Sequence, residues 1–138
     1  MNIVTIKNVS KDYNSLRAVD NIDLEIKKGE CFGFLGPNGA GKTTIMGIIY
    51  CFMPPTSGEV KVFDLNVLEN PSEIKARIGV VPQEENLDPD LSVLENLIVY
   101  ARYFNIPGKE SLKRALELLK FVELGSKTDV NINELSLL

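Results

Sequence analysis

One short segment of this chain has the residue types and spacing of a loop that binds phosphate. It consists of Gly36, Pro37, Asn38, Gly39, Ala40, Gly41, Lys42 and Thr43. The segment matches the whole pattern G-x-x-x-x-G-K-[ST], whose glycines let several backbone N–H groups point at one anion. Lys42 adds a positive charge that can reach the β- and γ-phosphates, and Thr43 offers a hydroxyl oxygen as a ligand for Mg²⁺. The alternative, a glycine-rich turn without a ligand, is disfavoured by the full match at fixed spacing.

The residues on either side of this loop predict a strand before it and a helix after it. Residues 31–35, Cys-Phe-Gly-Phe-Leu, form a continuous apolar run that is typical of a parallel strand buried on both faces. Beyond the loop, four apolar residues recur with the spacing of one helix face, namely Ile45, Ile48, Ile49 and Phe52. Pro54-Pro55 is expected to end that helix. The loop would therefore lie at a helix N-terminus, where the helix dipole favours anions.

Composition and charge narrow the possible classes of protein. The chain has 138 residues, which suits one domain of ordinary size, and its net charge of −4 disfavours a nucleic-acid-binding surface. The sequence has no apolar run long enough to cross a bilayer and no signal-peptide pattern at its N-terminus, so we expect a cytoplasmic location. Cys31 and Cys51 are expected to be reduced thiols in the core.

The remaining patterns predict a strand-rich part, residues 1–83, that carries the phosphate loop. Apolar and polar residues alternate within 22–26 and 59–62, as in half-buried antiparallel strands, and residues 3–9 predict a weaker strand. Asn70-Pro71 predicts the start of a short helix that reaches about Arg77. A further small apolar strand is expected at 78–81.

Residues 84–138 have a different composition and predict a helical part. Ser92 and Glu95 have the spacing of a capping box, which marks a helix start. Two helical stripes follow, Leu94, Leu97, Ile98 and Ala101, and then Leu112, Ala115, Leu116 and Leu119. We expect these two helices to pack on each other rather than on a ligand.

Taken together, these residues resemble the nucleotide-binding domain of ATP-binding cassette (ABC) transporters over the whole chain. A second threonine, Thr44, follows the phosphate loop, and Tyr13 stands where the family places an aromatic that stacks on adenine. Gln83 resembles the glutamine of the family's Q-loop, and residues 133–136 resemble the start of its signature sequence. Without the family context, Tyr13 would be an ordinary surface aromatic and Gln83 a solvated loop residue. Residues 81–104 also resemble the branch of nodulation-factor and daunorubicin-type exporters.

The resemblance implies an α/β fold, namely a P-loop NTPase core with an antiparallel β subdomain and a partial helical subdomain. It implies that ATP and Mg²⁺ are bound, with Thr43 and Gln83 at the metal and Gln83 as the catalytic-site residue that is present. It implies a membrane-spanning transporter subunit as partner, and a second ATP-binding subunit in a head-to-tail dimer of the intact parent. The chain would then be cytoplasmic and peripheral to the membrane, with no nucleic acid as a partner.

The resemblance stops at the signature sequence. Ser136 is followed by Leu137-Leu138, where the family has glycines, and the chain contains no histidine and no acidic Walker B strand. We therefore expect a domain truncated before the Walker B strand, through a frameshift, an incomplete gene model or a deliberate fragment. Three functions stay open: the ATP-binding part of an export ATPase, a non-enzymatic nucleotide-binding or regulatory fragment, and a non-functional remnant.

A polypeptide of these residues is expected to bind ATP without turning it over. Phosphoryl transfer needs metal, positioned water and charge neutralisation together, and the Walker B carboxylates and the switch histidine that the family uses are not in this sequence. The measurement is phosphate release with Mg²⁺-ATP, compared with release by the Lys42→Ala variant. Turnover well above that variant, in a sample whose intact mass ends at Leu138, would contradict this expectation.

Overall fold

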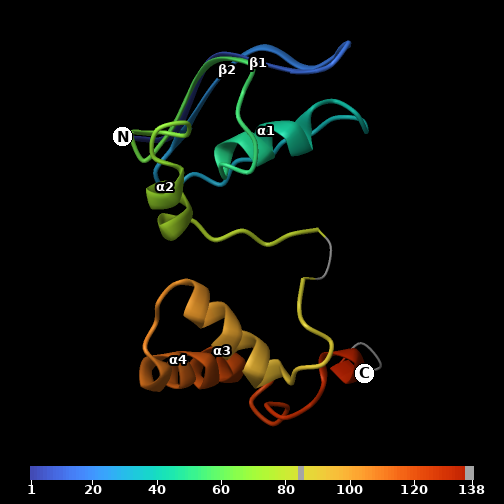
Figure 1. Ribbon diagram of the computed structural model, residues 1–138, viewed down its shortest axis with the longest axis vertical. Helices are drawn as coiled ribbons and strands as arrows, with labels where there is room; N and C mark the ends of the chain where they lie inside the picture. Colours follow the sequence, from blue (N-terminus) through green and yellow to red (C-terminus); the bar gives the residue numbers. More distant parts are fainter. Residues whose placement is uncertain (84–85, 136–138) are drawn as a thin grey trace. The chain divides into compact units, whose positions relative to one another are not determined.

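The computed structural model describes residues 1–83 and 86–135, and the chain forms two compact units, 1–80 and 81–138 (Figure 1). Unit 1 contains β1 (Asn2–Tyr13), β2 (Leu16–Lys27), α1 (Lys42–Ile49), β3 (Ser57–Val62), β4 (Leu65–Asn66) and α2 (Pro71–Arg77). Unit 2 contains α3 (Val93–Tyr103), α4 (Gly108–Phe121) and α5 (Ile132–Leu135). Among the described residues, no helix combines the length and the apolar character that a membrane crossing needs.

The sheet of unit 1 is antiparallel throughout, with the strand order β2-β1-β3-β4. The three strands predicted at residues 3–9, 22–26 and 59–62 lie within β1, β2 and β3, so those predictions are confirmed. The register of β1 shifts between Ile6 and Val9 against β2, where Asn8 has a φ of 49°. Gly58 of β3 passes so close that a Cβ there would lie 2.4 Å from the carbonyl oxygen of Asn8. Only glycine allows this approach of the two strands.

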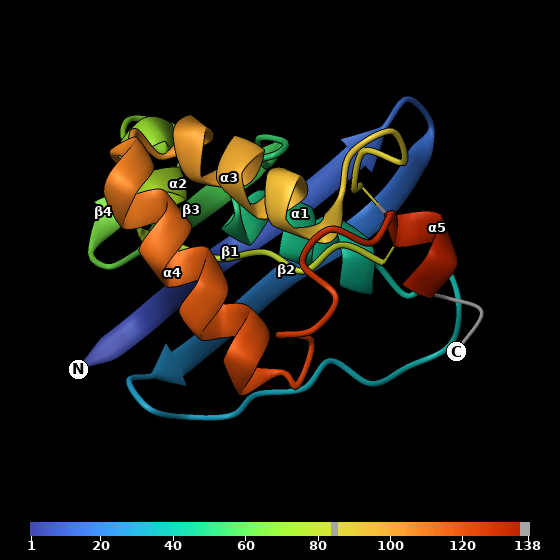
Figure 2. The same ribbon diagram turned by 90° about the horizontal axis from the view of Figure 1, so that it is seen from below.

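The core of unit 1 lies between the sheet and α1, with α2 contributing one residue (Figures 1 and 2). Ile45 and Ile48 of α1 pack with Ile74 of α2. The strand residues of the same core are Val4, Ile6, Val9, Val19, Val60 and Val62. Burial of these aliphatic side chains holds α1 against the sheet.

The buried strand predicted at residues 31–35 is absent. Cys31 is exposed, and Leu35 is 96% exposed. Within this run, only Phe34 packs against the core. No described segment pairs with these residues, and an apolar run becomes a strand only beside a hydrogen-bonding neighbour. Because residues 31–35 form no buried strand, the thiol of Cys31 lies on the surface, and the expectation of a core thiol is wrong there. Cys51 is half-buried, and burial raises the pKa of its thiol.

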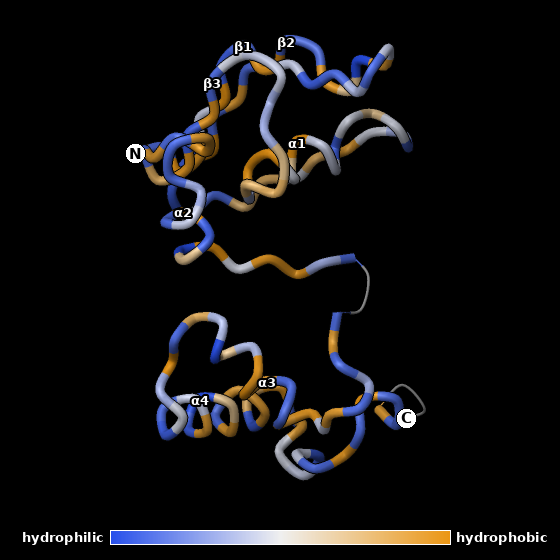
Figure 3. Tube along the Cα trace, viewed as in Figure 1, coloured by the Kyte–Doolittle hydropathy of each residue, from blue (hydrophilic) through white to orange (hydrophobic). Residues whose placement is uncertain are grey.

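Residues 78–81 also form no strand, although their sequence is apolar (Figure 3). The side chain of Val81 is almost wholly exposed. As at residues 31–35, no described strand lies beside this segment, and the prediction is wrong.

Helix α1 ends earlier than its apolar stripe predicts. Its last residue is Ile49, and Cys51 adopts a left-handed conformation with a φ of 60°. The N–H of Phe52 donates to the carbonyl of Gly47 at 2.8 Å, which closes the helix end. Phe52 is therefore 73% exposed and does not belong to the buried helix face.

The helix starts of α2 and α3 follow the sequence signals. Asn70 is the N-cap of α2 with Pro71 after it, although the Asn70 side chain makes no capping bond. In α3, Oγ of Ser92 accepts a hydrogen bond from the N–H of Glu95, and Oε2 of Glu95 accepts one from the N–H of Ser92. This is the predicted capping box, and its hydrogen bonds lower the pKa of the Glu95 carboxyl.

In unit 2, α3 packs against α4, as the sequence predicts. The buried positions of α4 are Ser111, Ala115 and Leu119. Leu112 and Leu116 are nearly half exposed, so their predicted place on the buried face is wrong. Hydrophilic and hydrophobic residues alternate along α4 (Figure 3), and only part of its apolar stripe is buried.

Candidate functional site

The glycine-rich loop leads directly into α1, which begins at Lys42 (Figure 1). Gly36, Gly39 and Gly41 have φ angles of 152°, 83° and 80°. L-residues other than glycine rarely adopt such angles, so the loop shape depends on glycine at these places. The first turn of α1 carries no acidic side chain, and nothing there opposes an anion at the positive end of the helix dipole.

Gly41 fixes the end of this loop against strand β2. A Cβ at Gly41 would lie 2.4 Å from the carbonyl oxygen of Ala18 and 3.2 Å from Cγ2 of Val19. The contact of Gly41 with Ala18 and Val19 could not be predicted from the glycine-rich motif, because only the folded strand β2 brings these residues to the loop. Arg17, the residue before Ala18, pairs with Asp12 of β1. The end of the loop therefore lies close to the final residues of β1.

Lys42 is bonded to the loop that precedes it. Its Nζ donates to the carbonyl oxygens of Gly36 at 2.7 Å and Pro37 at 2.6 Å. The ammonium group is thus held over the start of the loop, on the same chain segment whose N–H groups would surround an anion. A bound phosphate would replace these carbonyls as the partner of the charged group.

Tyr13 ends β1, and its side chain is 42% exposed. Its hydroxyl donates to Sδ of Met53 at 2.8 Å, and Nζ of Lys11 lies 5.4 Å from the ring centroid. Lys11 is itself anchored by a 2.7 Å hydrogen bond to the carbonyl of Pro54. Both views place the β1–β2 turn and the glycine-rich loop toward the same end of unit 1 (Figures 1 and 2).

The remaining predicted site residues differ in how the structure places them. Thr43 and Thr44 lie in the first turn of α1, next to Lys42, with Thr43 exposed and Thr44 half-buried. Gln83 belongs to unit 2 and has an exposed side chain. Ser136 lies outside the described residues. The structure therefore brings together the loop and the two threonines within unit 1, and Gln83 belongs to a separate unit.

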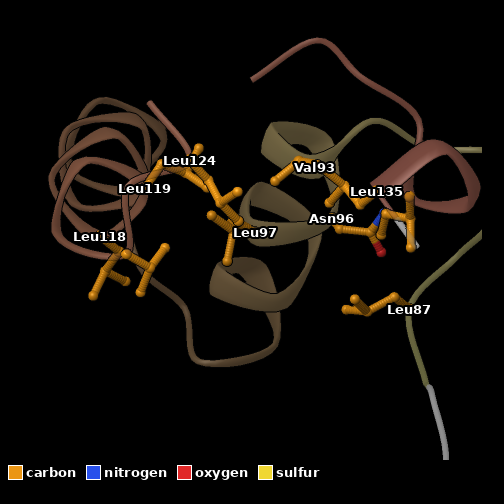
Figure 4. Close-up of a pocket in the computed structure, with 10 residues that line it drawn as sticks. Leu87, Val93, Asn96, Leu97, Leu118, Leu119, Leu124 and Leu135 are labelled. Atoms are coloured by element: carbon orange, nitrogen blue, oxygen red, sulfur yellow. The ribbon is translucent and has the colours of Figure 1, made fainter. Parts of the chain in front are cut away.

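Unit 2 contains an apolar cavity of about 280 Å³ that is unsuited to a nucleotide (Figure 4). It lies among α3, α4 and α5, and its lining includes Val93, Leu97, Leu119 and Leu135. Asn96 supplies the polar group among the residues drawn there. A triphosphate needs charged or N–H donors around it, and such groups are provided by the loop of unit 1 instead.

A family model and similar known proteins all relate this chain to one protein family. A family model described as "ABC transporter" matches residues 19–137. The Nod factor export ATP-binding protein I of Cupriavidus metallidurans is 42% identical over 134 residues, which cover 97% of this chain and 44% of that protein. The protein of the same name from Burkholderia thailandensis is 40% identical over 133 residues, covering 96% and 44%. The chain thus spans less than half the length of these relatives.

Solved structures show the same architecture. The ATP-binding cassette MJ0796, determined as a dimer in a post-hydrolysis state bound to ADP and Pi, superposes with a TM-score of 0.79 at 36% identity. The match covers 94% of this chain and 62% of that one. Another dimeric structure of MJ0796, described as a bacterial ABC transporter cassette, gives a TM-score of 0.80 at 35% identity, covering 95% and 62%.

Proposed function

This chain belongs to the ABC transporter family, and from that premise we propose that it is the ATP-binding part of a transporter ATPase subunit. The resemblance predicted from the sequence, including the nodulation-factor exporter branch, is confirmed. So is the fold class, a partial ABC ATPase domain with an antiparallel sheet and several helices. We propose further that the parent protein powers export through a separate membrane subunit.

Mg²⁺-ATP would bind with its β- and γ-phosphates in the loop formed by residues 36–43. One observation carries this proposal. The ammonium group of Lys42 donates hydrogen bonds to the backbone carbonyl oxygens of Gly36 and Pro37, at the start of the loop. When phosphate enters, Lys42 transfers its hydrogen bonds from these carbonyls to phosphate oxygens, which are stronger acceptors. Thr43, whose side chain is exposed, would hold the metal through its hydroxyl oxygen. Mg²⁺ would neutralise phosphate charge there.

The direct test is a calorimetric titration of the chain with nucleotides in the presence of Mg²⁺. We expect saturable binding of one ATP per chain, competition by ADP, and much weaker binding of AMP. The order follows from the site, because the loop contacts the β- and γ-phosphates that AMP lacks. Absence of saturable ATP binding, or equal affinity for ATP and AMP, would contradict the proposal.

Tyr13 would stack on the adenine ring at the edge of this site. Tyr13→Ala is expected to weaken ATP binding by about 5- to 150-fold, since base–aromatic stacking is worth about 1–3 kcal/mol. Tyr13→Phe and Tyr13→Trp should retain most of the affinity because they keep an aromatic face, although Phe loses the hydroxyl bond to Met53. A fluorescent ATP analogue measures all three dissociation constants.

The matched control is Tyr103→Ala, which removes an exposed tyrosine from unit 2. It should leave the dissociation constant unchanged. Equal affinities for the alanine, phenylalanine and tryptophan variants at position 13 would place Tyr13 outside the site.

We propose that the partners are a membrane-spanning subunit and a second ATP-binding subunit, with the chain on the cytoplasmic side of the membrane. Residues 83–103 would face the membrane subunit. The aromatic residues at the end of α3 support this, because Tyr103 is 74% exposed and Phe104 is also exposed. Exposed apolar side chains that lie next to one another mark interaction surfaces, and aromatic residues are enriched there.

A further inference from the structure

Unit 2 contains a second cavity, of about 310 Å³, between α3 and α4. Most of its lining is apolar and includes Leu97 and Leu118, which also line the cavity drawn in Figure 4. The two cavities are therefore neighbours. Two polar side chains of α4, Ser111 and Arg114, complete the lining of the second one.

Ser111 is a buried residue whose hydroxyl makes no hydrogen bond. The residue is 2% exposed, and among the residues that the structure describes its Oγ has no partner. A serine hydroxyl within a helix often donates to the carbonyl four residues earlier. Here the carbonyl of Pro107 accepts the N–H of Ser111 at 2.8 Å instead. A buried hydroxyl without a partner costs stability that alanine would not, so its position in the lining of a cavity indicates a ligand that bonds to it.

In the neighbouring cavity, the polar side chain is already bonded. Asn96 is also 2% exposed, and its Oδ1 accepts a hydrogen bond from the N–H of Asp88 at 2.8 Å. Its Nδ2 donates to the carbonyl oxygens of Asp88 at 3.0 Å and Ser92 at 3.1 Å. The amide of Asn96 is thus engaged with the backbone, whereas the hydroxyl of Ser111 is available to a ligand.

The charge at the edge of the second cavity is already paired. Nε of Arg114 donates to Oε1 of Glu110 at 2.6 Å, and this hydrogen bond lowers the pKa of the Glu110 carboxyl. Glu110 is therefore ionised at neutral pH and balances the charge of Arg114. An anionic ligand would have to displace this carboxylate, so the cavity favours a neutral molecule.

Aromatic side chains near the end of α3 favour a ligand with rings. Tyr100 and Phe104 both line the cavity. The hydroxyl of Tyr100 donates to the carbonyl of Asn86 at 2.7 Å, and its ring meets that of Tyr103 edge to face with 5.9 Å between centroids. These contacts hold the Tyr100 ring in place, where it can pack on another aromatic ring. Since a cavity of about 150 Å³ accepts one benzene ring, this one has room for two fused rings.

We propose that this cavity binds a neutral aromatic molecule of two fused rings whose hydroxyl bonds to Oγ of Ser111. The ligand supplies a partner for the buried hydroxyl, and its rings remove the side chains of Leu97 and Leu118 from water. The residues that line the cavity all belong to unit 2. The site is therefore independent of nucleotide binding at the glycine-rich loop.

The binding test compares 2-naphthol with 2-methylnaphthalene, in which a methyl group replaces the hydroxyl. Fluorescence titration of the whole chain gives both dissociation constants. Because the methyl compound is also the more apolar, the quantity compared is the affinity of 2-naphthol divided by that of 2-methylnaphthalene. Ser111→Ala is expected to lower this ratio about 2- to 10-fold, the net effect of one hydrogen bond. An unchanged ratio, or no saturable binding of 2-naphthol to the wild-type chain, would overturn the proposal.

Two further variants locate the bound probe. Ala101→Phe places a ring inside the cavity and should abolish binding of both compounds. Leu87→Ala alters the neighbouring cavity, whose lining does not include Ser111, and should leave both affinities unchanged. Retained binding in Ala101→Phe, or lost binding in Leu87→Ala, would overturn the proposal.

A charged probe tests the preference for a neutral ligand. In 2-naphthoate a carboxylate replaces the hydroxyl of 2-naphthol. It should bind at least tenfold more weakly to the wild-type chain, because Glu110 already occupies Arg114. Equal or tighter binding of 2-naphthoate would overturn the assignment to a neutral molecule.

The missing partner of Ser111 is tested without any ligand. Ser111→Ala should raise the protection of α4 amides against hydrogen exchange about 5- to 150-fold, because it removes a buried hydroxyl that has no partner. The better helix propensity of alanine contributes only about two- to threefold of this gain. A gain no larger than that factor would show that the hydroxyl is bonded in the unliganded chain, and would overturn the proposal.

Discussion

Lys42→Ala is expected to weaken the binding of Mg²⁺-ATP by about 30- to several-thousand-fold. Truncating one partner of a desolvated, hydrogen-bonded charge pair costs on the order of 2–5 kcal/mol, much of it from leaving the other charge unpaired. The side chain also holds the carbonyls of Gly36 and Pro37, so its removal frees the start of the loop as well. Titration calorimetry in the presence of Mg²⁺ measures the change in the dissociation constant.

Lys109→Ala is the matched control for this variant. Lys109 lies in the first turn of α4, so both substitutions remove a lysine from a helix N-terminus, and only Lys42 follows a glycine-rich loop. The control should bind ATP with unchanged affinity. An unchanged dissociation constant for Lys42→Ala, or an equal loss for Lys109→Ala, would show that the charge of Lys42 is not directed at the nucleotide.

Those parts of the fold and the site that depend on local geometry could be predicted from the sequence. Glycine adopts a positive φ without strain, so the spacing of the glycines in residues 36–43 predicts a tightly turning loop, which the structure shows at the start of α1. The capping box of Ser92 and Glu95 involves groups within one turn and was predicted for the same reason. The alternation of apolar and polar residues within β2 and β3 follows from the two-residue period of a strand.

The parts that depend on distant neighbours could not be predicted. Residues 31–35 have the composition of a buried strand, but the ladder that would make them one has to come from another segment. The approach of Ala18 to Gly41 depends on how β2 lies against the loop, which no local pattern encodes. The role of Asn96 could not be predicted either. Its side chain bonds to backbone groups of residues 88 and 92, and backbone partners carry no sequence signal.

Gly41→Ala is expected to destabilise unit 1 by about 2–5 kcal/mol and to reduce ATP binding strongly. A left-handed backbone angle costs an L-residue about 1–2 kcal/mol, and Gly41 has a φ of 80°. Overpacking adds about 1–3 kcal/mol, because the new Cβ would lie 2.4 Å from the carbonyl oxygen of Ala18. The contact is with the backbone of a strand, which cannot rotate away. Urea unfolding followed by circular dichroism measures the loss of stability.

Gly39→Ala separates the two causes. Gly39 has a φ of 83°, nearly the angle of Gly41, but a Cβ there would meet no atom within 4 Å. This variant should therefore lose only the conformational part, about 1–2 kcal/mol. The difference between the two variants measures the cost of pushing the end of the loop away from β2, and the larger fall in ATP affinity should accompany Gly41→Ala. Equal stability of the two variants would mean that Gly41 and Ala18 are not in contact in the folded chain, and that the loop is positioned by its own turn alone.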